Sequence, residues 1–199
     1  KDEKLTVELK RTGHLTSGWR NEYATLPEDK QLETFEKSIG NGYKNPVKLE
    51  SLSFAGLHDL SDSLKMSYTY TVKNEVIEAG SMKMIRIPMI DVVATVDNFS
   101  SDKREYPVEY WDYENTDVYE TTINVLLPPG QTFIEIPTNQ NFTFKNSTYS
   151  LKFVKEGQKL KIVRTANLQR ANVAAAEYTA FKKFLSDIVE AESKYIVFK

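Results

Sequence analysis

The sequence predicts a mainly β fold, either an antiparallel β-sandwich or a barrel-like fold, with two helices packed on it. Runs that alternate apolar and polar residues dominate the chain, and the clearest one covers residues 64–72 (LKMSYTYTV). Tight turns join many of these runs, which favours antiparallel pairing. Only two segments, 27–39 and 174–191, show helical spacing, which is too few for a scheme that alternates strands and helices.

The first part of the chain combines a strand with a helix. Residues 5–12 alternate as a strand does, whereas 15–23 is compatible with a helical turn or with a broken edge. Pro27 suits the first position of the helix 27–39, and acidic residues follow it, as the helix dipole favours. The sequence Gly-Asn-Gly at 40–42 is typical of a helix end.

Strand patterns then fill most of the remaining sequence, and the helix 174–191 precedes the last of them. We expect this helix to pack across the mouth or open face of its sheet. A loop-like stretch at 98–103 predicts either two domains, 1–100 and 101–199, or one compact unit. The expected strands are 47–54, 64–72, 82–90, 92–99, 106–113, 118–127, 132–136, 142–144, 149–154, 160–164 and 195–198.

Composition excludes several classes of protein. The 199 residues carry a net charge of -2 with interspersed signs, which argues against a nucleic-acid partner. No apolar run approaches the roughly 20 residues of a membrane-spanning helix. The chain has no cysteine, which excludes disulfides, thiolate metal sites and a cysteine nucleophile. The sequence predicts no cofactor and no metal site.

The acidic and aromatic stretch 105–120 is the first candidate for a binding site. Tyr110, Trp111 and Tyr113 could form an aromatic platform for a sugar ring or a peptide, with neighbouring carboxylates accepting hydrogen bonds. The favoured alternative is a hairpin whose aromatic face is buried and whose acidic face is exposed, because strands use aromatic residues in any case.

Other candidate sites are weaker still. Asp112, Glu114 and Asp117 offer oxygen ligands for calcium, but they lack the spacing and the glycine of an EF-hand loop. His14 and His58 are the two histidines, and no nucleophile motif accompanies either of them. We therefore predict that both are loop or surface histidines and that the chain itself is not an enzyme.

The second half of the chain carries a series of landmarks. Their order resembles the region that follows the papain-like core in bacterial transglutaminase-like proteins, a region known as a domain of unknown function. The landmarks are Arg104-Glu-Tyr-Pro-Val, Leu127-Pro-Pro-Gly, Pro137, a strand that ends near Arg164, and Tyr178-x-x-Phe-x-x-Phe-Leu before the strand 195–198.

This resemblance implies that a catalytic core with a Cys-His-Asp triad precedes Lys1 in the same chain. No catalytic residue carries over, because the nucleophile of that core is a cysteine. The resemblance implies a non-catalytic accessory domain that braces the core or shapes substrate access, in an exported protein of the periplasm or cell surface of a Gram-negative bacterium. The alternative is a glycan- or peptide-binding β module that uses the aromatic patch.

Overall fold

The computed structural model describes residues 2–60, 63–111, 113–114 and 116–199. Strands account for 43% of the chain and helices for 23%, which confirms the prediction of a mainly β fold. Within these residues the strands pair antiparallel and form three open sheets rather than a closed barrel.

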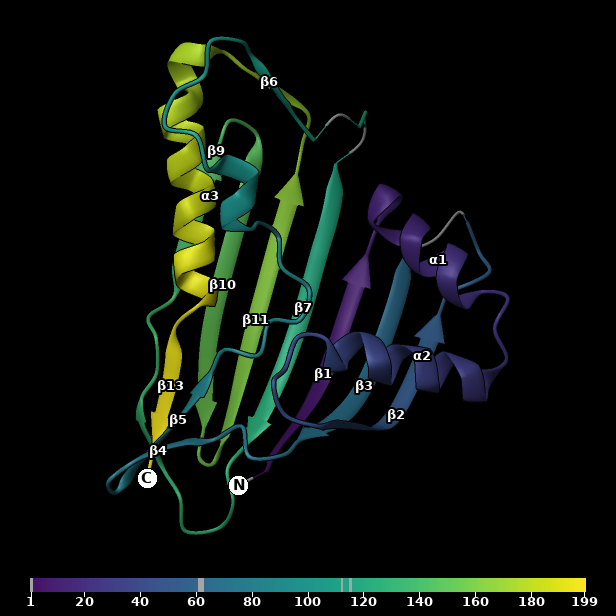
Figure 1. Cartoon of the computed structure of the whole chain (residues 1–199), viewed down its shortest axis with the longest axis vertical. Helices are drawn as coiled ribbons and strands as arrows, with labels where there is room; N and C mark the ends of the chain where they lie inside the picture. The colour runs from purple at the N-terminus through teal and green to yellow at the C-terminus, as the bar shows by residue number, and fades with distance from the viewer. Residues whose placement is uncertain (1, 61–62, 112, 115) are drawn as a thin grey trace.

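The largest sheet has seven strands, which are, in spatial order, β2 (Val47–Ala55), β3 (Leu64–Val72), β1 (Glu3–Arg11), β7 (Asp117–Leu126), β11 (Lys159–Leu168), β10 (Ser147–Glu156) and β9 (Gln140–Phe144) (Figure 1). Strand β1 joins the two halves, because Leu5 lies opposite Tyr70 of β3 on one side and Val125 of β7 on the other. One hydrogen-bonded sheet therefore contains strands from both sides of residue 100.

Two smaller sheets complete the fold. A two-stranded sheet lies beside one end of the large sheet, and a four-stranded sheet lies near both termini (Figure 1). The strands of these sheets are β12 (Ala171–Val173) with β6 (Val108–Tyr110), and β4 (Ile77–Ala79), β5 (Met82–Arg86), β13 (Tyr195–Phe198) and β8 (Phe133–Glu135).

Both predicted helices are present, with small changes at their starts. Helix α2 (Glu28–Gly40) begins one residue after Pro27. Pro27 is the N-cap residue and has an extended backbone (φ -64°, ψ 155°), so it is not itself part of the helix. Helix α3 (Tyr178–Glu192) follows a 3-10 turn, η3 (Ala175–Glu177). The ambiguous stretch after β1 is helical, and the remaining helical elements are η1 (Gly13–Thr16), α1 (Ser17–Tyr23) and η2 (Val96–Phe99).

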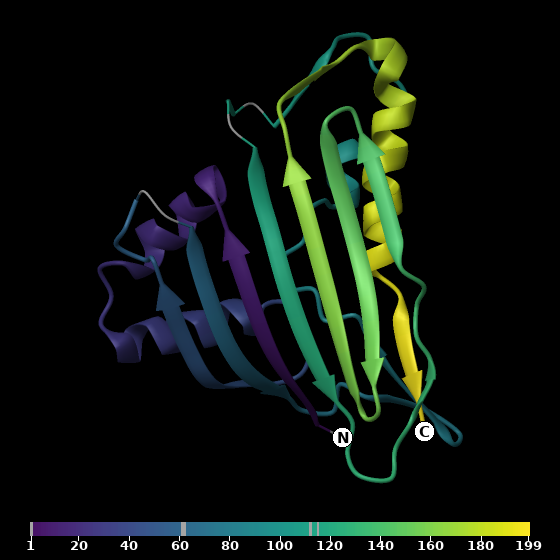
Figure 2. The same cartoon turned by 180° about the vertical axis from the view of Figure 1, so that it is seen from behind.

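The helices cover only one face of the large sheet. Along β1 the odd-numbered residues are buried and the even-numbered ones are exposed or half-buried, as period-two alternation requires. Phe35 of α2 packs edge-on against Tyr68 at 4.8 Å between ring centroids, and Phe181 of α3 lies 5.3 Å from Phe144. Figure 2 shows the opposite face, where the strands lie in front of the helices. By the sequence of the strands, the side chains on that face are mainly polar.

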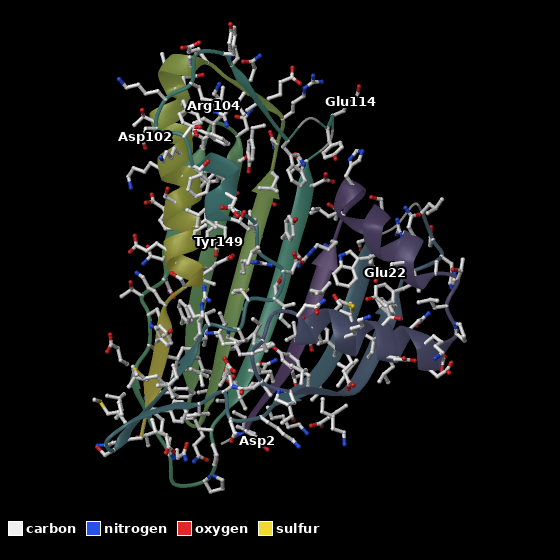
Figure 3. The ribbon with its side chains drawn as sticks, in the orientation of Figure 1. Asp2, Glu22, Asp102, Arg104, Glu114 and Tyr149 are labelled. Atoms are coloured by element: carbon white, nitrogen blue, oxygen red, sulfur yellow. The ribbon has the colours of Figure 1, made fainter. Side chains whose placement is uncertain are left out.

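The segment between β5 and β6 crosses the covered face and is fastened to α3 (Figures 1 and 3). Lys182 of α3 donates a hydrogen bond to the Asp102 carboxylate (2.8 Å), and the Arg104 guanidinium lies over the Tyr178 ring at 5.4 Å. The connection at 98–103, predicted from its loop-like composition, is thus packed onto the last helix.

Candidate functional site

The three aromatic residues predicted as a platform do not share one surface. Tyr110, the last residue of β6, packs against Phe181 of α3 with ring centroids 5.0 Å apart. Burial raises the pKa of the Tyr110 hydroxyl. The next residue, Trp111, has a positive φ of 52°, which turns the chain away from β6 toward the start of β7. Trp111 and Tyr113 therefore lie apart from Tyr110, in edge-to-face contact with each other at 5.5 Å.

Trp111 and Tyr113 join a cluster around a buried carboxylate, which we call the Asp117 cluster (His14, Trp111, Tyr113 and Asp117). Asp117 is fully buried at the start of β7. Its Oδ2 accepts a hydrogen bond from the Trp111 indole Nε1 (3.0 Å), and its Oδ1 accepts one from the His14 backbone N–H (3.2 Å). The Nδ1 atom of His14 lies 3.6 Å from Oδ2. Because these donors are internal, the carboxylate is satisfied within the protein.

A glycine makes this arrangement sterically feasible. Gly13 has a φ of +51°, and a Cβ atom added to it would lie 1.8 Å from Oδ1 of Asp117. Only glycine leaves room for the carboxylate against the backbone at this position. In the sequence, the one sign of this site is that Gly13 directly precedes His14. The carboxylate that packs against Gly13 belongs to Asp117, more than 100 residues further along the chain.

The exposed part of the Asp117 cluster is a pair of stacked rings. The His14 and Tyr113 rings lie 3.5 Å apart at an angle of 17°, and their exposed fractions are 51% and 39%. This pair offers a small flat surface, with the half-buried Trp111 behind it. Glu114 lies exposed on the same loop (Figure 3), and Asp112 of the calcium hypothesis lies outside the described residues. Binding of a glycan or peptide here stays a prediction.

A second polar cluster lies inside the protein and was not predicted. Arg11 of β1 and Arg164 of β11 are 1% and 0% exposed, and both donate to Thr121 Oγ1, at 3.2 and 3.1 Å. Arg11 also binds the Asp91 carboxylate, with 2.9 Å between Nε and Oδ2. Arg164 donates to Glu192 Oε1 (3.0 Å) and to the Asp91 backbone carbonyl. We call these residues the buried charge network.

The network is held in place by aromatic side chains. The hydroxyl of Tyr149, which extends from β10 toward α3 (Figure 3), donates to Glu192 Oε1 at 3.0 Å. Burial raises the pKa of Tyr149, and the Glu192 carboxylate adds to that effect. Both guanidinium groups lie over the Tyr119 ring, at 4.4 Å for Arg11 and 5.6 Å for Arg164. The network therefore links the crossing segment at Asp91, the sheet and the end of α3.

Two hollows lie away from both clusters. One, of about 430 Å³, lies on the bare face of the large sheet and is lined by residues that include Lys10, Lys65 and Glu120. The other, of about 760 Å³, lies between the start of α2 and the second half of β2, and His58 is part of its lining. The two histidines thus occupy different sites, and neither lines the buried charge network.

Two further kinds of site are absent from the described residues. Among the described residues, no group of three or more His, Cys, Asp or Glu side chains is placed to hold a metal ion. In the same residues, no helix combines the length and apolar character that crossing a membrane requires.

Part of the chain matches a known protein family. Residues 83–198 match DUF3858, a family described as a domain of unknown function with a solved structure. The match begins in β5, ends in β13 and covers more than half of the chain. No curated protein and no solved structure shows significant similarity to the chain. By the extent of the family match, this chain belongs to the DUF3858 family.

Proposed function

We propose that this chain is a non-catalytic accessory domain of a larger exported protein with a transglutaminase-like or protease-like core. In this role it braces the core or shapes the access of substrates to it. The observation that carries the proposal is that the buried charged side chains, which are the candidates for a catalytic role, form hydrogen bonds and ion pairs with one another or with other internal groups. Asp117 binds Trp111 and His14, while Arg11 and Arg164 bind acidic partners inside the protein.

Such internal bonds fix a scaffold rather than prepare a reactive group. A catalytic base or nucleophile must reach a substrate atom, and a carboxylate that already accepts two internal hydrogen bonds at zero exposure does not. The link to a transglutaminase-like core comes from the order of the sequence landmarks between residues 104 and 198, which overlaps the DUF3858 match.

The test uses the complete reading frame that encodes this chain. We expect it to encode a papain-like core with a cysteine nucleophile before residue 1. The core is produced without the chain, and its melting temperature and its transamidation and peptidase activities are measured before and after purified chain is added. A rise in either quantity supports the accessory role. A reading frame without such a core, or a core that is indifferent to the chain, refutes it.

Export is a separate part of the same proposal. Cell fractionation of the source bacterium, with antibodies against the chain, should place the protein in the periplasm or at the cell surface. Recovery with the cytosolic fraction would contradict export without touching the domain's relation to a core.

The stacked rings of His14 and Tyr113 favour a second candidate function, a glycan- or peptide-binding module. In a Trp19→Phe background, the fluorescence of Trp111 reports on this patch alone. Addition of chitotetraose or of a casein hydrolysate should leave the emission unchanged if the domain is only a scaffold. A saturable shift that disappears in Tyr113→Ala would favour the binding module.

A further inference from the structure

The large sheet has an open edge at β2. Strand β2 pairs with β3 on one side and, among the described residues, with no strand on the other. An open edge strand presents unpaired N–H and C=O groups, and proteins usually block them. The N–H and C=O groups of β2 that are left unprotected therefore show where another strand could pair with the edge of the sheet.

The blocking devices lie in the first half of β2. The backbone N–H of Leu49 points away from β3 and donates to Oε2 of Glu36, a side chain of α2, at 2.7 Å. The pairing register with β3 shifts between Leu49 and Ser51, which is a bulge. An exposed lysine, Lys48, precedes them. Each of these features is a known protection against edge pairing.

The second half of β2 lacks such protection among the described residues. In a strand of L-residues, the face of the side chain and the lateral direction of the N–H are fixed together. Leu52 and Phe54 share the covered face with Leu49, so their N–H and C=O groups also point to the outer edge. No described side chain donates to or accepts from the backbone of Leu52 or Phe54.

A pocket lies directly beside this unblocked half. It has a volume of about 760 Å³ and is bounded by β2, the loop after it and the first turns of α2. Leu32 of α2 and Leu26 of the loop before it line one side, and Leu52 and Phe54 line it from the strand side. Leu32 is 36% exposed, so the part of the wall that these four residues form is apolar and open to solvent, while Gln31 and His58 are among the polar residues of the lining. Figures 1 and 2 show the start of α2 projecting beyond β2, so the helix overhangs the edge.

We propose that the second half of β2 binds an extended peptide, which adds to the large sheet as an eighth strand beneath the overhanging start of α2. Main-chain hydrogen bonds to Leu52 and Phe54 supply affinity, and side chains at alternate positions of the peptide enter the pocket. This site is separate from the Asp117 cluster and does not depend on the accessory role proposed above.

The shape of the edge selects a peptide over a second copy of the chain. Antiparallel pairing of two β2 strands about a two-fold axis would place both α2 helices on the same face, each projecting toward the other. Because the start of α2 projects beyond β2 in Figures 1 and 2, such a pair would direct the two helices at one another, whereas a single extended peptide brings no second helix to the edge.

The lining of the pocket defines the chemistry of the peptide. The apolar wall of Leu26, Leu32 and Phe54 fits leucine or valine at alternate positions. The side chains in between would lie beside Ser53 and Ala55 on the polar face, which suits threonine or serine. Glu28 lies exposed on the rim and forms no ion pair with any described residue, so a lysine or arginine at the end of the peptide complements it.

The test is a titration of the whole chain with a fluorescein-labelled nine-residue peptide. In this peptide valine or leucine alternates with threonine, and a lysine lies at each end. We expect saturable binding by fluorescence anisotropy, and slower hydrogen exchange at the amides of Leu52 and Phe54. Leu32→Glu, which places a charge in the pocket wall, should weaken binding by about tenfold or more.

The matched control is Ser38→Glu, which adds the same charge at another exposed position of α2 outside the pocket. It should bind the peptide as the original chain does, and circular dichroism establishes that both variants fold. A peptide N-methylated at alternate residues, which cannot donate to β2, should lose binding.

The outcomes separate the alternatives. Equal binding to the Leu32→Glu variant, or retained binding of the N-methylated peptide, would overturn the site. Absence of binding at peptide concentrations of about 1 mM would do the same. A dimer in sedimentation experiments that Leu32→Glu dissociates would assign the edge to a second copy and would also overturn the peptide proposal.

Discussion

Glu3 makes the stability of the fold depend on pH in an unusual direction. Its side chain extends from β1 into the covered face and is 6% exposed, and its Oε1 atom forms no hydrogen bond with a described residue. Burial raises the pKa of the Glu3 carboxyl from 4.5 to about 8, and the charge of Glu75 adds to the rise. The folded protein therefore holds Glu3 protonated at a pH where the unfolded chain has released the proton.

The sign of the effect follows from this difference. A carboxyl whose pKa is raised in the folded state contributes most stability below pH 4.5, and this stability is lost as the pH rises through about 8. Between these values the free energy of unfolding falls by about 1.4 kcal/mol per pH unit. The whole shift corresponds to roughly 4–5 kcal/mol, a large share of the roughly 5–15 kcal/mol that holds a typical domain folded.

Glu3→Gln removes the titration and keeps the size of the side chain. We expect the variant to match the original chain near pH 4.5 and to exceed it by several kcal/mol above pH 8. Urea unfolding followed by circular dichroism at five pH values from 5 to 9 measures the difference. Glu8→Gln is the matched control, because Glu8 lies exposed on the same strand.

The difference between Glu3→Gln and the original chain is decisive because titrations elsewhere cancel in it. A difference that stays constant from pH 5 to 9 within about 1 kcal/mol would refute a buried, protonated Glu3. A similar slope in the Glu8→Gln control would attribute the effect to overall charge instead.

Three further predictions concern the two polar clusters. Glu192→Gln should lower the free energy of unfolding by about 3 kcal/mol, since it leaves the guanidinium of Arg164 buried without its carboxylate, and urea unfolding measures the loss. Gly13→Ala should destabilise the chain by more than about 2 kcal/mol, because the added Cβ would overlap the Asp117 side chain. Thermal melting measures the loss, and Gly18→Ala is the control, because a Cβ added at Gly18 meets no atom within 4 Å. Trp111→Phe should cost about 1–3 kcal/mol by removing the indole donor to Asp117, and a cost below about 0.5 kcal/mol would show that the bond contributes nothing.

The sequence predicted the long strands of the large sheet well because each of them buries one face. It was wrong at 92–99, where a strand was expected and residues 96–99 form the 3-10 turn η2, and at 106–113 only Val108–Tyr110 is a strand, β6. The run 64–72 reads as a strand and forms β3, with its five apolar positions buried. The helix starts were less accurate. Pro27 was predicted as the first helical residue, but its extended ψ makes it the N-cap of α2. The residues predicted as the first turn of α3 form the 3-10 turn η3. Both differences concern helix ends, where several backbone conformations compete closely.

The candidate site was harder to predict, because its geometry depends on contacts between distant residues. The adjacent residues Tyr110 and Trp111 diverge at a positive φ that period-two alternation does not anticipate. The two arginines of the buried charge network read as polar residues at strand ends, and only the pairing of β1, β7 and β11 brings them together. Local patterns indicate on which face of a strand a residue lies, but they do not identify the distant residue that it contacts on that face.

The position of the family match separates the two proposed roles. DUF3858 covers residues 83–198, whereas the unblocked half of β2 and its pocket belong to residues 24–59. Strands β1, β3 and β2 lie outside the matched residues and continue the sheet beyond β7, and the outer edge at β2 is the proposed peptide site. The accessory role would therefore be shared by the family, while peptide binding at β2 would depend on the added strands and on α2. Family members whose sheet ends at β7 should not bind the alternating peptide, and the same anisotropy titration on one of them checks this.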